Sequence, residues 1–202
     1  MGVTLYHFPT SSNALKVRFM LAELDLTYER VEVPRARPRP DWYLELNPQG
    51  GIPTIADDDF VLAESNTILR YLAQRESRAD LYPKSLRERA VVERLLDAWS
   101  MLVRPSIFPL ERASGVHDER DDEAAAAALP DAQRSLEALE ALVADNGTMT
   151  GAFTIADMCA APTLFRTRAL DLPLDWQRLP RLAVIRDTVT ARPTFAAADP
   201  VR

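Results

Sequence analysis

The first third of the chain alternates between strand-like and helix-like patterns. Residues 3–8 (VTLYHF) form an apolar run of strand length, and residues 11–24 place apolar side chains at helical spacing. A second strand-like run follows at residues 28–33. A strand, a helix and a strand joined by short turns favour parallel pairing of the two strands, with the helix across one face of the sheet.

The segment that follows continues this mixed pattern up to residue 77. Repeated prolines in PRARPRP remove backbone hydrogen-bond donors and exclude a regular helix, so they predict a loop. An acidic turn, Asp57-Asp58-Asp59, separates two short apolar runs and fits a hairpin. The expected elements are a loop at 34–40, a helical turn at 41–46, strands at 54–56 and 60–62, and a helix at 65–74.

From residue 86 onward the pattern is helical, and strand signals vanish. Helical spacing runs through AVVERLLDAWSMLV, SLEALEALV, IADMCAAPTLFRTRAL and RLAVIRDTVTA. Residues 118–129 predict a further helix, and Pro130 either starts a new helix or kinks this one. The polar stretch before residue 86 contains Pro83 and predicts a linker. We therefore expect a domain at residues 1–77, a linker at 78–85 and an all-helical domain at 86–202.

The composition of the chain indicates which class of molecule it binds. The chain has 202 residues, 47% of them hydrophobic and 27% charged, with a net charge of -6, so we expect a folded protein that binds neither nucleic acid nor an anionic membrane. A small molecule is therefore the expected binding partner. The single Cys159 forms no internal disulfide, and no secretory leader pattern follows Met1, which predicts a cytoplasmic protein. His7 and His117 lack metal-ligand spacing, so no metal is expected.

Four short motifs occur in a fixed order along the chain: SSNALKVR at residues 11–18, NPQGGIP at 47–53, Glu64-Ser65, and FTIAD at 153–157. Together with the order of elements, they resemble the cytosolic glutathione S-transferase family, of the serine type and similar to bacterial members, over essentially the whole chain. The resemblance implies an α+β N-terminal thioredoxin-like domain (β-α-β-α-β-β-α) followed by an all-α C-terminal domain. It also implies glutathione as co-substrate and a homodimer.

In this family the peptide before the motif proline is cis, so the resemblance implies a cis Ile52-Pro53 bond. Ile52 then presents its own N–H and C=O to the cysteinyl unit of glutathione, as an added antiparallel strand would require. The alternative is a trans proline that only starts a strand. Many relatives carry a long polar residue before this pair, whereas here Gly51 stands, so the glycine end of glutathione needs another contact. Arg35, Arg37 or Arg39 are the candidates, and Arg39 is taken as the glutathione-binding residue, although three arginines between prolines also fit a solvated loop.

Glu64-Ser65 stands where a strand passes into a helix. Unpaired N–H groups and the positive end of the helix dipole meet there, which suits a carboxylate. By resemblance this is the γ-glutamyl carboxylate, held by the hydroxyl and N–H of Ser65, with Glu64 near the amino group. The alternative is that Ser65 only caps its helix. Residues 154–157 form a capping box, which we assign to folding.

The chemistry requires a thiolate, because a thiol with a pKa near 8.5 is only a few per cent ionised at neutral pH. In serine-type members a hydroxyl in the turn after the first strand donates a hydrogen bond to the sulfur, and Ser11 matches that position. Ser12 is the rival, since a shift of one residue in the turn would exchange them. Some members use a tyrosine at this strand, but alternation turns Tyr6 to the opposite face, and His7 reads as structural.

The electrophile pocket is expected at Phe8 and along one helix face of the second domain. That face carries Trp99, Leu102, Val103, Ser106 and Ile107 at positions i, i+3, i+4, i+7 and i+8, although such a stripe also fits plain core. The predicted function is conjugation of glutathione to small apolar electrophiles. A glutathione-dependent isomerase of the maleylacetoacetate isomerase type is weakened because its Ser-Ser-Cys triplet reads Ser11-Ser12-Asn13 here. A non-catalytic module that binds glutathione or a partner protein is the third possibility.

Overall fold

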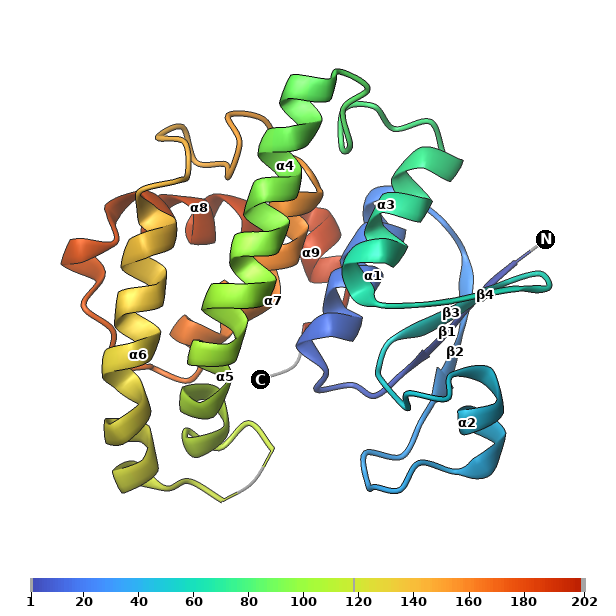
Figure 1. Ribbon diagram of the computed structural model, residues 1–202, viewed down its shortest axis with the longest axis horizontal. Helices are drawn as coiled ribbons and strands as arrows, with labels where there is room; N and C mark the ends of the chain where they lie inside the picture. The colour runs from blue at the N-terminus through green and yellow to red at the C-terminus, as the bar shows by residue number, and fades with distance from the viewer. Residues whose placement is uncertain (1, 118, 201–202) are drawn as a thin grey trace. The chain divides into compact units, whose positions relative to one another are not determined.

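The computed structural model describes residues 2–117 and 119–200, which fall into two compact units (Figure 1). The first unit combines residues 2–77 with residues 193–200. The second unit spans residues 78–192. The first contains all of the strands found in the described residues, and the second is helical.

The first unit is built on a four-stranded sheet of mixed direction. The strand order is β2-β1-β3-β4, in which β1 and β2 are parallel and the other pairs are antiparallel. The parallel pair matches the expectation for a strand, a helix and a strand joined by short turns. The strands are β1 (Val3–His7), β2 (Tyr28–Glu32), β3 (Thr54–Asp57) and β4 (Phe60–Ala63).

Helices cover both faces of this sheet. On β1, His7 contacts Arg18 of α1 (Ser12–Glu23), with Nδ1 and Nη1 3.2 Å apart. The neighbouring Tyr6 packs instead on Tyr43 of α2 (Asp41–Leu46), with ring centroids 6.1 Å apart. Because consecutive strand residues point to opposite faces, α1 and α2 lie on opposite sides. The third helix, α3 (Ser65–Arg75), lies beside α1 (Figure 1). The thioredoxin-like order predicted for this unit is confirmed.

The second unit confirms the all-helical prediction. Helix α6 continues through Pro130, because its buried face, including Ala132, Leu136 and Leu139, carries on beyond the proline. Residue 118, where the predicted helix begins, lies outside the described residues. No helix in the described part of the chain is long and apolar enough to cross a membrane. The helices are α4 (Leu86–Ala98), η1 (Trp99–Val103), α5 (Arg104–Ala113), α6 (Asp122–Glu140), α7 (Ile155–Ala169), η2 (Trp176–Arg178) and α8 (Pro180–Thr190).

The end of the chain corrects the expected domain of residues 86–202. Helix α9 (Pro193–Ala197) and the residues after it pack on the first unit. The guanidinium of Arg18 donates from Nε to the Ala198 carbonyl at 2.9 Å and from Nη2 to the Asp199 carbonyl at 3.1 Å. A fully buried guanidinium needs such acceptors, and the returning segment supplies them. The aromatic ring of Phe195 also packs in the core of this unit, edge-on to Phe19 at 5.2 Å.

The expected linker at residues 78–85 is a packed segment of the second unit. Leu81 and Tyr82 within it are only 1% and 8% exposed. The Leu81 carbonyl accepts a hydrogen bond from the N–H of Ile155 at 3.0 Å, and the Tyr82 hydroxyl donates to Glu93 at 2.5 Å. The polar residues around this pair concealed its role in the sequence, because two anchors are too few to produce a periodic pattern.

The capping box predicted at residues 154–157 is confirmed at the start of α7. Asp157 Oδ2 accepts from the N–H of Thr154 at 2.8 Å, and Asp157 Oδ1 accepts from the N–H of Met149 at 2.7 Å. Burial raises the pKa of Asp157 to about 6, although these hydrogen bonds favour its charged form. The box therefore joins the helix to the loop before it as well as capping it.

Candidate functional site

The strand register gathers three predicted segments at one edge of the sheet. Tyr6 near the end of β1 pairs with Thr54 at the start of β3, which in turn pairs with Ala63 at the end of β4. The turn after β1, the segment before β3 and the junction after β4 therefore meet at the same edge. These segments carry the predicted residues Ser11, Ser12, Ile52, Pro53, Glu64 and Ser65.

Ile52 stands immediately before β3, and its bond to Pro53 is cis, as the family resemblance implies. Ile52 is half-buried and Pro53 is buried. Within residues 2–117 and 119–200, neither the N–H nor the C=O of Ile52 has a hydrogen-bond partner. A donor and an acceptor on one residue beside a strand are what an added peptide strand needs for pairing.

The junction between β4 and α3 also leaves polar groups open. Glu64 adopts a positive φ of 69° and precedes the helix, and no side chain caps it. Ser65 is the first residue of α3 and is 8% exposed. Its hydroxyl makes no hydrogen bond within the described ranges, so the alternative in which Ser65 caps α3 is not realised. The first-turn N–H groups and this hydroxyl form a place that suits a carboxylate.

Ser11 and Ser12 occupy different positions at the start of α1. Ser11 is the N-cap residue, and its Oγ accepts a hydrogen bond from the N–H of Ala14 at 3.1 Å. A hydroxyl that accepts in this way keeps its own hydrogen for a further acceptor. Ser12 is the first residue of the helix. Both are buried, at 7% and 4% exposed.

A group of polar side chains that the sequence did not reveal surrounds the carbonyl of Gly51. The Tyr43 hydroxyl donates to this oxygen, and Asn47 Nδ2 donates to it at 3.1 Å. Thr54 Oγ1 lies 2.8 Å from the Tyr43 hydroxyl and 3.1 Å from Asn47 Nδ2. All three side chains are buried, at 0–5% exposed. No local pattern in the sequence indicates this group, because Asn47 lies just after α2 and the three side chains meet only in the folded chain.

Arg39, a predicted glutathione contact, is largely engaged by main-chain carbonyls on either side of α2. It is 7% exposed, donates from Nε to the Gly50 carbonyl at 3.1 Å, and donates from Nη1 to the Pro34 carbonyl. Its guanidinium lies 5.6 Å from the ring centroid of Phe8. Burial, followed by the charge of Arg37, lowers the pKa of Arg39. Gly50 has a φ of +62°, and an added Cβ would lie 3.1 Å from Arg39 Cγ, so glycine suits this position.

His7 is a structural residue of the turn that carries Ser11. Its Nδ1 accepts from the guanidinium of Arg18, which also donates to the Pro9 carbonyl at 3.2 Å. Burial, together with the charges of Arg18 and Arg30, lowers the pKa of His7 to about 4. At neutral pH the imidazole is therefore uncharged and able to accept this bond.

The predicted electrophile stripe is split in the structure. Trp99 and Val103 are 1% and 0% exposed, whereas Leu102 is 41% exposed. Ser106 is half-buried, and its hydroxyl donates to the Leu102 carbonyl at 2.9 Å. The expectation of a shared face is wrong because η1 is a π-helix, whose wider turn moves Leu102 and Ser106 off the face of Trp99. Phe8 is half-buried in the first unit.

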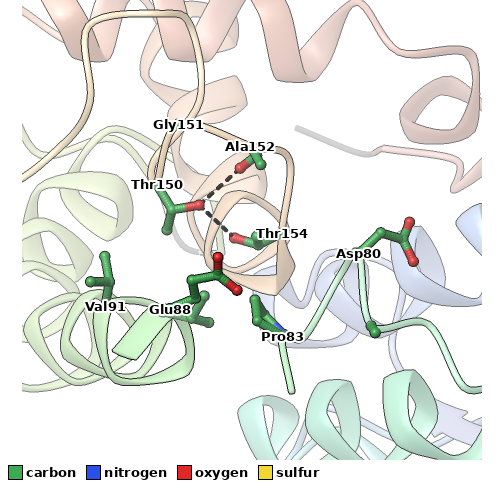
Figure 2. Close-up of a pocket in the computed structure, with 10 residues that line it drawn as sticks. Asp80, Pro83, Glu88, Val91, Thr150, Gly151, Ala152 and Thr154 are labelled. Carbon is green, nitrogen blue, oxygen red and sulfur yellow. Dashed lines mark hydrogen bonds between the residues drawn. The ribbon is translucent and has the colours of Figure 1, made fainter. Parts of the chain in front are cut away.

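A hollow in the second unit is unrelated to these residues. It has a volume of about 480 Å³, and none of the predicted site residues lines it. Figure 2 labels Glu88 and Pro83 among the lining residues and shows the bond that the Thr150 hydroxyl donates to the Ala152 carbonyl, 2.9 Å long. We assign the hollow no role.

Comparison with known proteins agrees with this arrangement. Residues 5–80 match the model of the glutathione S-transferase N-terminal domain, and residues 122–184 match that of the C-terminal domain. The chain is 30% identical to glutathione S-transferase GstB of Escherichia coli K12 (95% of this chain, 94% of that protein) and 31% identical to maleylacetoacetate isomerase of Pseudomonas aeruginosa (97% and 95%). The theta class glutathione S-transferase of Xanthomonas axonopodis pv. citri, solved with glutathione bound, superimposes with a TM-score of 0.87 at 28% identity, covering 100% of this chain and 98% of that one. The chain therefore belongs to the glutathione S-transferase family.

Proposed function

We propose that this chain is a glutathione S-transferase that activates the thiol of glutathione for attack on small apolar electrophiles. The observation that carries the proposal is the unpaired N–H and C=O of Ile52 at the sheet edge that also bears Ser11 and the start of α3. A short peptide with an acidic end and a thiol has complementary groups for all three. The GstB protein of E. coli, to which the chain is 30% identical, is a glutathione S-transferase by name.

Each part of glutathione has a proposed contact. The γ-glutamyl carboxylate binds the N–H and hydroxyl of Ser65, where the helix dipole is positive, and Glu64 lies near the amino group. The cysteinyl unit pairs with the main chain of Ile52, next to Pro53. The glycine carboxylate binds the edge of the Arg39 guanidinium that is not engaged with Gly50 or Pro34.

Ser11 is proposed to donate a hydrogen bond to the sulfur of glutathione, and Ser12 is the alternative donor. A bond to a charged acceptor contributes about 1.5–3 kcal/mol, equivalent to roughly one to two pKa units. Lowering the thiol pKa from ~8.5 to ~6.5 raises the thiolate fraction roughly 25-fold at pH 7. The thiolate then forms a carbon–sulfur bond with the electrophile, and a leaving group such as chloride departs with its electron pair. Holding the two reactants together supplies the rest of the acceleration.

The electrophile contacts are proposed separately for each unit. In the first unit Phe8 is the candidate, because its ring is half-buried. In the second unit the exposed Leu102 and the half-buried Ser106 are better candidates than Trp99 and Val103, whose burial leaves no surface for a substrate. Trp99 and Val103 are assigned to the core that supports them.

The experiment that tests the function compares Ser11→Gly with Ser12→Ala. Glycine removes the hydroxyl but weakens the N-cap by only a few tenths of a kcal/mol, so α1 should persist. We expect Ser11→Gly to raise the thiol pKa of bound glutathione by one to two units and to lower kcat/KM for the aryl halide chlorodinitrobenzene about tenfold at neutral pH. The pH dependence of kcat/KM measures both. An unchanged profile in Ser11→Gly with a shifted one in Ser12→Ala would transfer the role to Ser12, and unchanged profiles in both would refute it.

A second candidate function is glutathione-dependent cis–trans isomerisation, favoured by the 31% identity to a maleylacetoacetate isomerase. Asn13 stands where the cysteine of the Ser-Ser-Cys triplet is expected, which argues against it. Turnover of maleylacetoacetate faster than that of an aryl halide would establish the isomerase. Tight glutathione binding by calorimetry without turnover of either substrate would instead identify a non-catalytic binding module.

A homodimeric state and a cytoplasmic location are proposed on the family resemblance. Analytical ultracentrifugation of the purified protein tests the first, and fractionation of cells that express it tests the second. A mass near that of a single 22.6 kDa chain would refute the dimer.

A further inference from the structure

The carbonyl oxygen of Gly51 is fully occupied by buried donors. A carbonyl oxygen has two lone pairs, and here the Tyr43 hydroxyl and Asn47 Nδ2 each donate to it. Tyr43 is 0% exposed and Asn47 is 5% exposed, so water does not compete for these bonds. This is an unusual concentration of polar side chains for one loop carbonyl, because most buried carbonyls are satisfied by main-chain N–H groups.

One proton assignment satisfies the whole group. If the Tyr43 hydroxyl donates to Gly51, the Thr54 hydroxyl donates to the Tyr43 oxygen 2.8 Å away and accepts from Asn47 Nδ2 at 3.1 Å. The orientation of the Asn47 amide is fixed because its Oδ1 accepts from the N–H of Gln49 at 3.2 Å. Burial raises the pKa of the Tyr43 phenol, so it keeps the proton that it donates.

The peptide between Gly51 and Ile52 carries this constraint to the proposed glutathione contact. That peptide is trans, and a trans peptide is planar with its C=O and N–H directed to opposite sides. Holding the Gly51 oxygen therefore aims the Ile52 N–H away from the buried group. We propose that Tyr43 and Asn47 are positioning residues for glutathione, which act through the Gly51 carbonyl and set the direction of the Ile52 N–H. The inference rests on the proposed function.

The loop at residues 47–53 needs these hydrogen bonds to be ordered because it contains two adjacent glycines. Glycine has more backbone freedom than other residues, so Gly50-Gly51 would leave the Ile52 N–H poorly ordered before the ligand binds. The Gly50 carbonyl is held as well, by Arg39 Nε at 3.1 Å and by Arg37 Nη2 at 3.4 Å. A binding group that is already ordered avoids that entropic cost on association, which raises affinity.

The test is Tyr43→Phe, which removes one hydroxyl and keeps the ring. Its matched control is Tyr71→Phe, which removes a hydroxyl of the same unit that donates to Asp57 Oδ2 at 2.6 Å, remote from Gly51 in the network. We expect Tyr43→Phe to raise the Kd of glutathione by calorimetry, and its KM, about tenfold. The KM for chlorodinitrobenzene and the kcat at saturating glutathione should stay within about twofold of wild type. Tyr71→Phe should leave the glutathione Kd within about twofold of wild type, because Tyr71 makes no hydrogen bond to the group around the Gly51 carbonyl.

Two further measurements separate positioning from other causes. The analogue γ-glutamyl-α-aminobutyryl-glycine has the same main chain as glutathione without the sulfur, so its Kd should rise by the same factor in Tyr43→Phe. Thr54→Val removes the hydroxyl that supports Tyr43 and Asn47 but leaves both bonds to Gly51, so its effect on Kd should be smaller, about twofold to threefold. This variant decides the question if Tyr43→Phe does not fold.

The outcomes are distinct. A glutathione Kd within twofold of wild type in Tyr43→Phe, or the same loss in Tyr71→Phe, overturns the inference and leaves the proposed function intact. A rise in both KM values together with a lowered melting temperature would show a general structural role and also overturns it. If Tyr43→Phe does not fold, an unchanged Kd in Thr54→Val overturns it. Failure of the wild-type chain to bind glutathione or the analogue refutes the proposed function, and the inference with it.

Discussion

Two arginines, Arg18 in the first unit and Arg166 in the second, are each 1% exposed, yet their charges are stabilised differently. The partners of Arg18 include the carbonyls of Pro9, Ala198 and Asp199 and Nδ1 of His7. Arg166 lies 4.0 Å from Glu111 Oε2, which also accepts from Arg104 Nη1 at 2.6 Å. Burial lowers the pKa of Arg166, and the Glu111 carboxylate opposes that effect.

The two arginines differ in the kind of group that stabilises each charge. Arg18 uses main-chain dipoles from distant parts of the chain, which no substitution can remove. Glu111 and Arg166 use side chains on α5 and α7, which can be replaced together. In the described part of the chain, Glu111 Oε1 has no hydrogen-bond partner, so this second cluster is less completely satisfied. Arg18 is thus stabilised mainly by main-chain carbonyls, and Arg166 by a side chain that can be replaced.

The largest effect is expected from breaking the second cluster. Glu111→Met leaves the guanidinium of Arg166 buried without its carboxylate, which should lower the free energy of unfolding by about 3–5 kcal/mol. Urea denaturation measures the change. The control is Glu88→Met, which removes an exposed carboxylate of the same unit and should change stability by less than about 0.5 kcal/mol.

The double variant Glu111→Met with Arg166→Met sharpens the comparison. Because it removes both buried charges, it should recover more than half of the stability lost in Glu111→Met. A double variant as unstable as the single one, or less stable, would contradict the view that side-chain charges in this unit can be replaced together.

A smaller and more local effect is expected from Arg18→Met. Its carbonyl acceptors would lose their donor, at a cost of about 2–3 kcal/mol, and the segment 193–200 would detach from the first unit. Hydrogen exchange should quicken at those residues before others. The control is Arg30→Met, because Arg30 pairs with the same Asp199 at 3.5 Å but is exposed, so its loss should cost under about 1 kcal/mol. Equal exchange in the two variants would count against the assigned role of Arg18.

The smallest effect is a pH dependence from His7. Its pKa is about 4 in the folded chain and near 6.5 when unfolded, so the unfolded state binds the proton first. The stability contributed by neutral His7 is complete above pH 6.5 and is lost as the pH falls toward 4. At pH 5 the loss in the free energy of unfolding is about 2 kcal/mol. Burial raises the pKa of Asp157 to about 6, so Asp157 has a pH dependence of the opposite sign, and the effect of His7 is the difference between wild type and His7→Asn. The wild-type urea midpoint should fall relative to that of His7→Asn between pH 7 and 5. An equal change in the two proteins would disprove the effect.

Local patterns predicted most of the first unit. The run at residues 3–8, the helix after Ser11 and the acidic hairpin turn each depend on neighbours in sequence, and the structure has β1, α1 and the β3–β4 hairpin there. The capping box at Thr154 was equally readable, since its bonds span three residues. The segments that meet at the sheet edge followed from the order of elements, because register then fixes which turns are neighbours.

The features that the sequence concealed depend on contacts between distant residues. Nothing local to Tyr43 indicates that its hydroxyl reaches Gly51, and nothing local to Ala198 indicates that its carbonyl accepts from Arg18. The π turn at η1 was also hidden, since apolar residues at Trp99 and Val103 fit a regular helix as well as a wider one. A single face drawn on ideal helical spacing is therefore divided between the buried Trp99 and Val103 and the exposed Leu102.

The return of residues 193–200 to the first unit has a consequence for biosynthesis. A ribosome makes residues 2–77 first, then the whole second unit, and only afterwards the carbonyls that bind Arg18. Because domains otherwise fold in the order of their synthesis, the Arg18 guanidinium of the nascent amino-terminal part lacks the Ala198 and Asp199 carbonyls until translation is nearly finished.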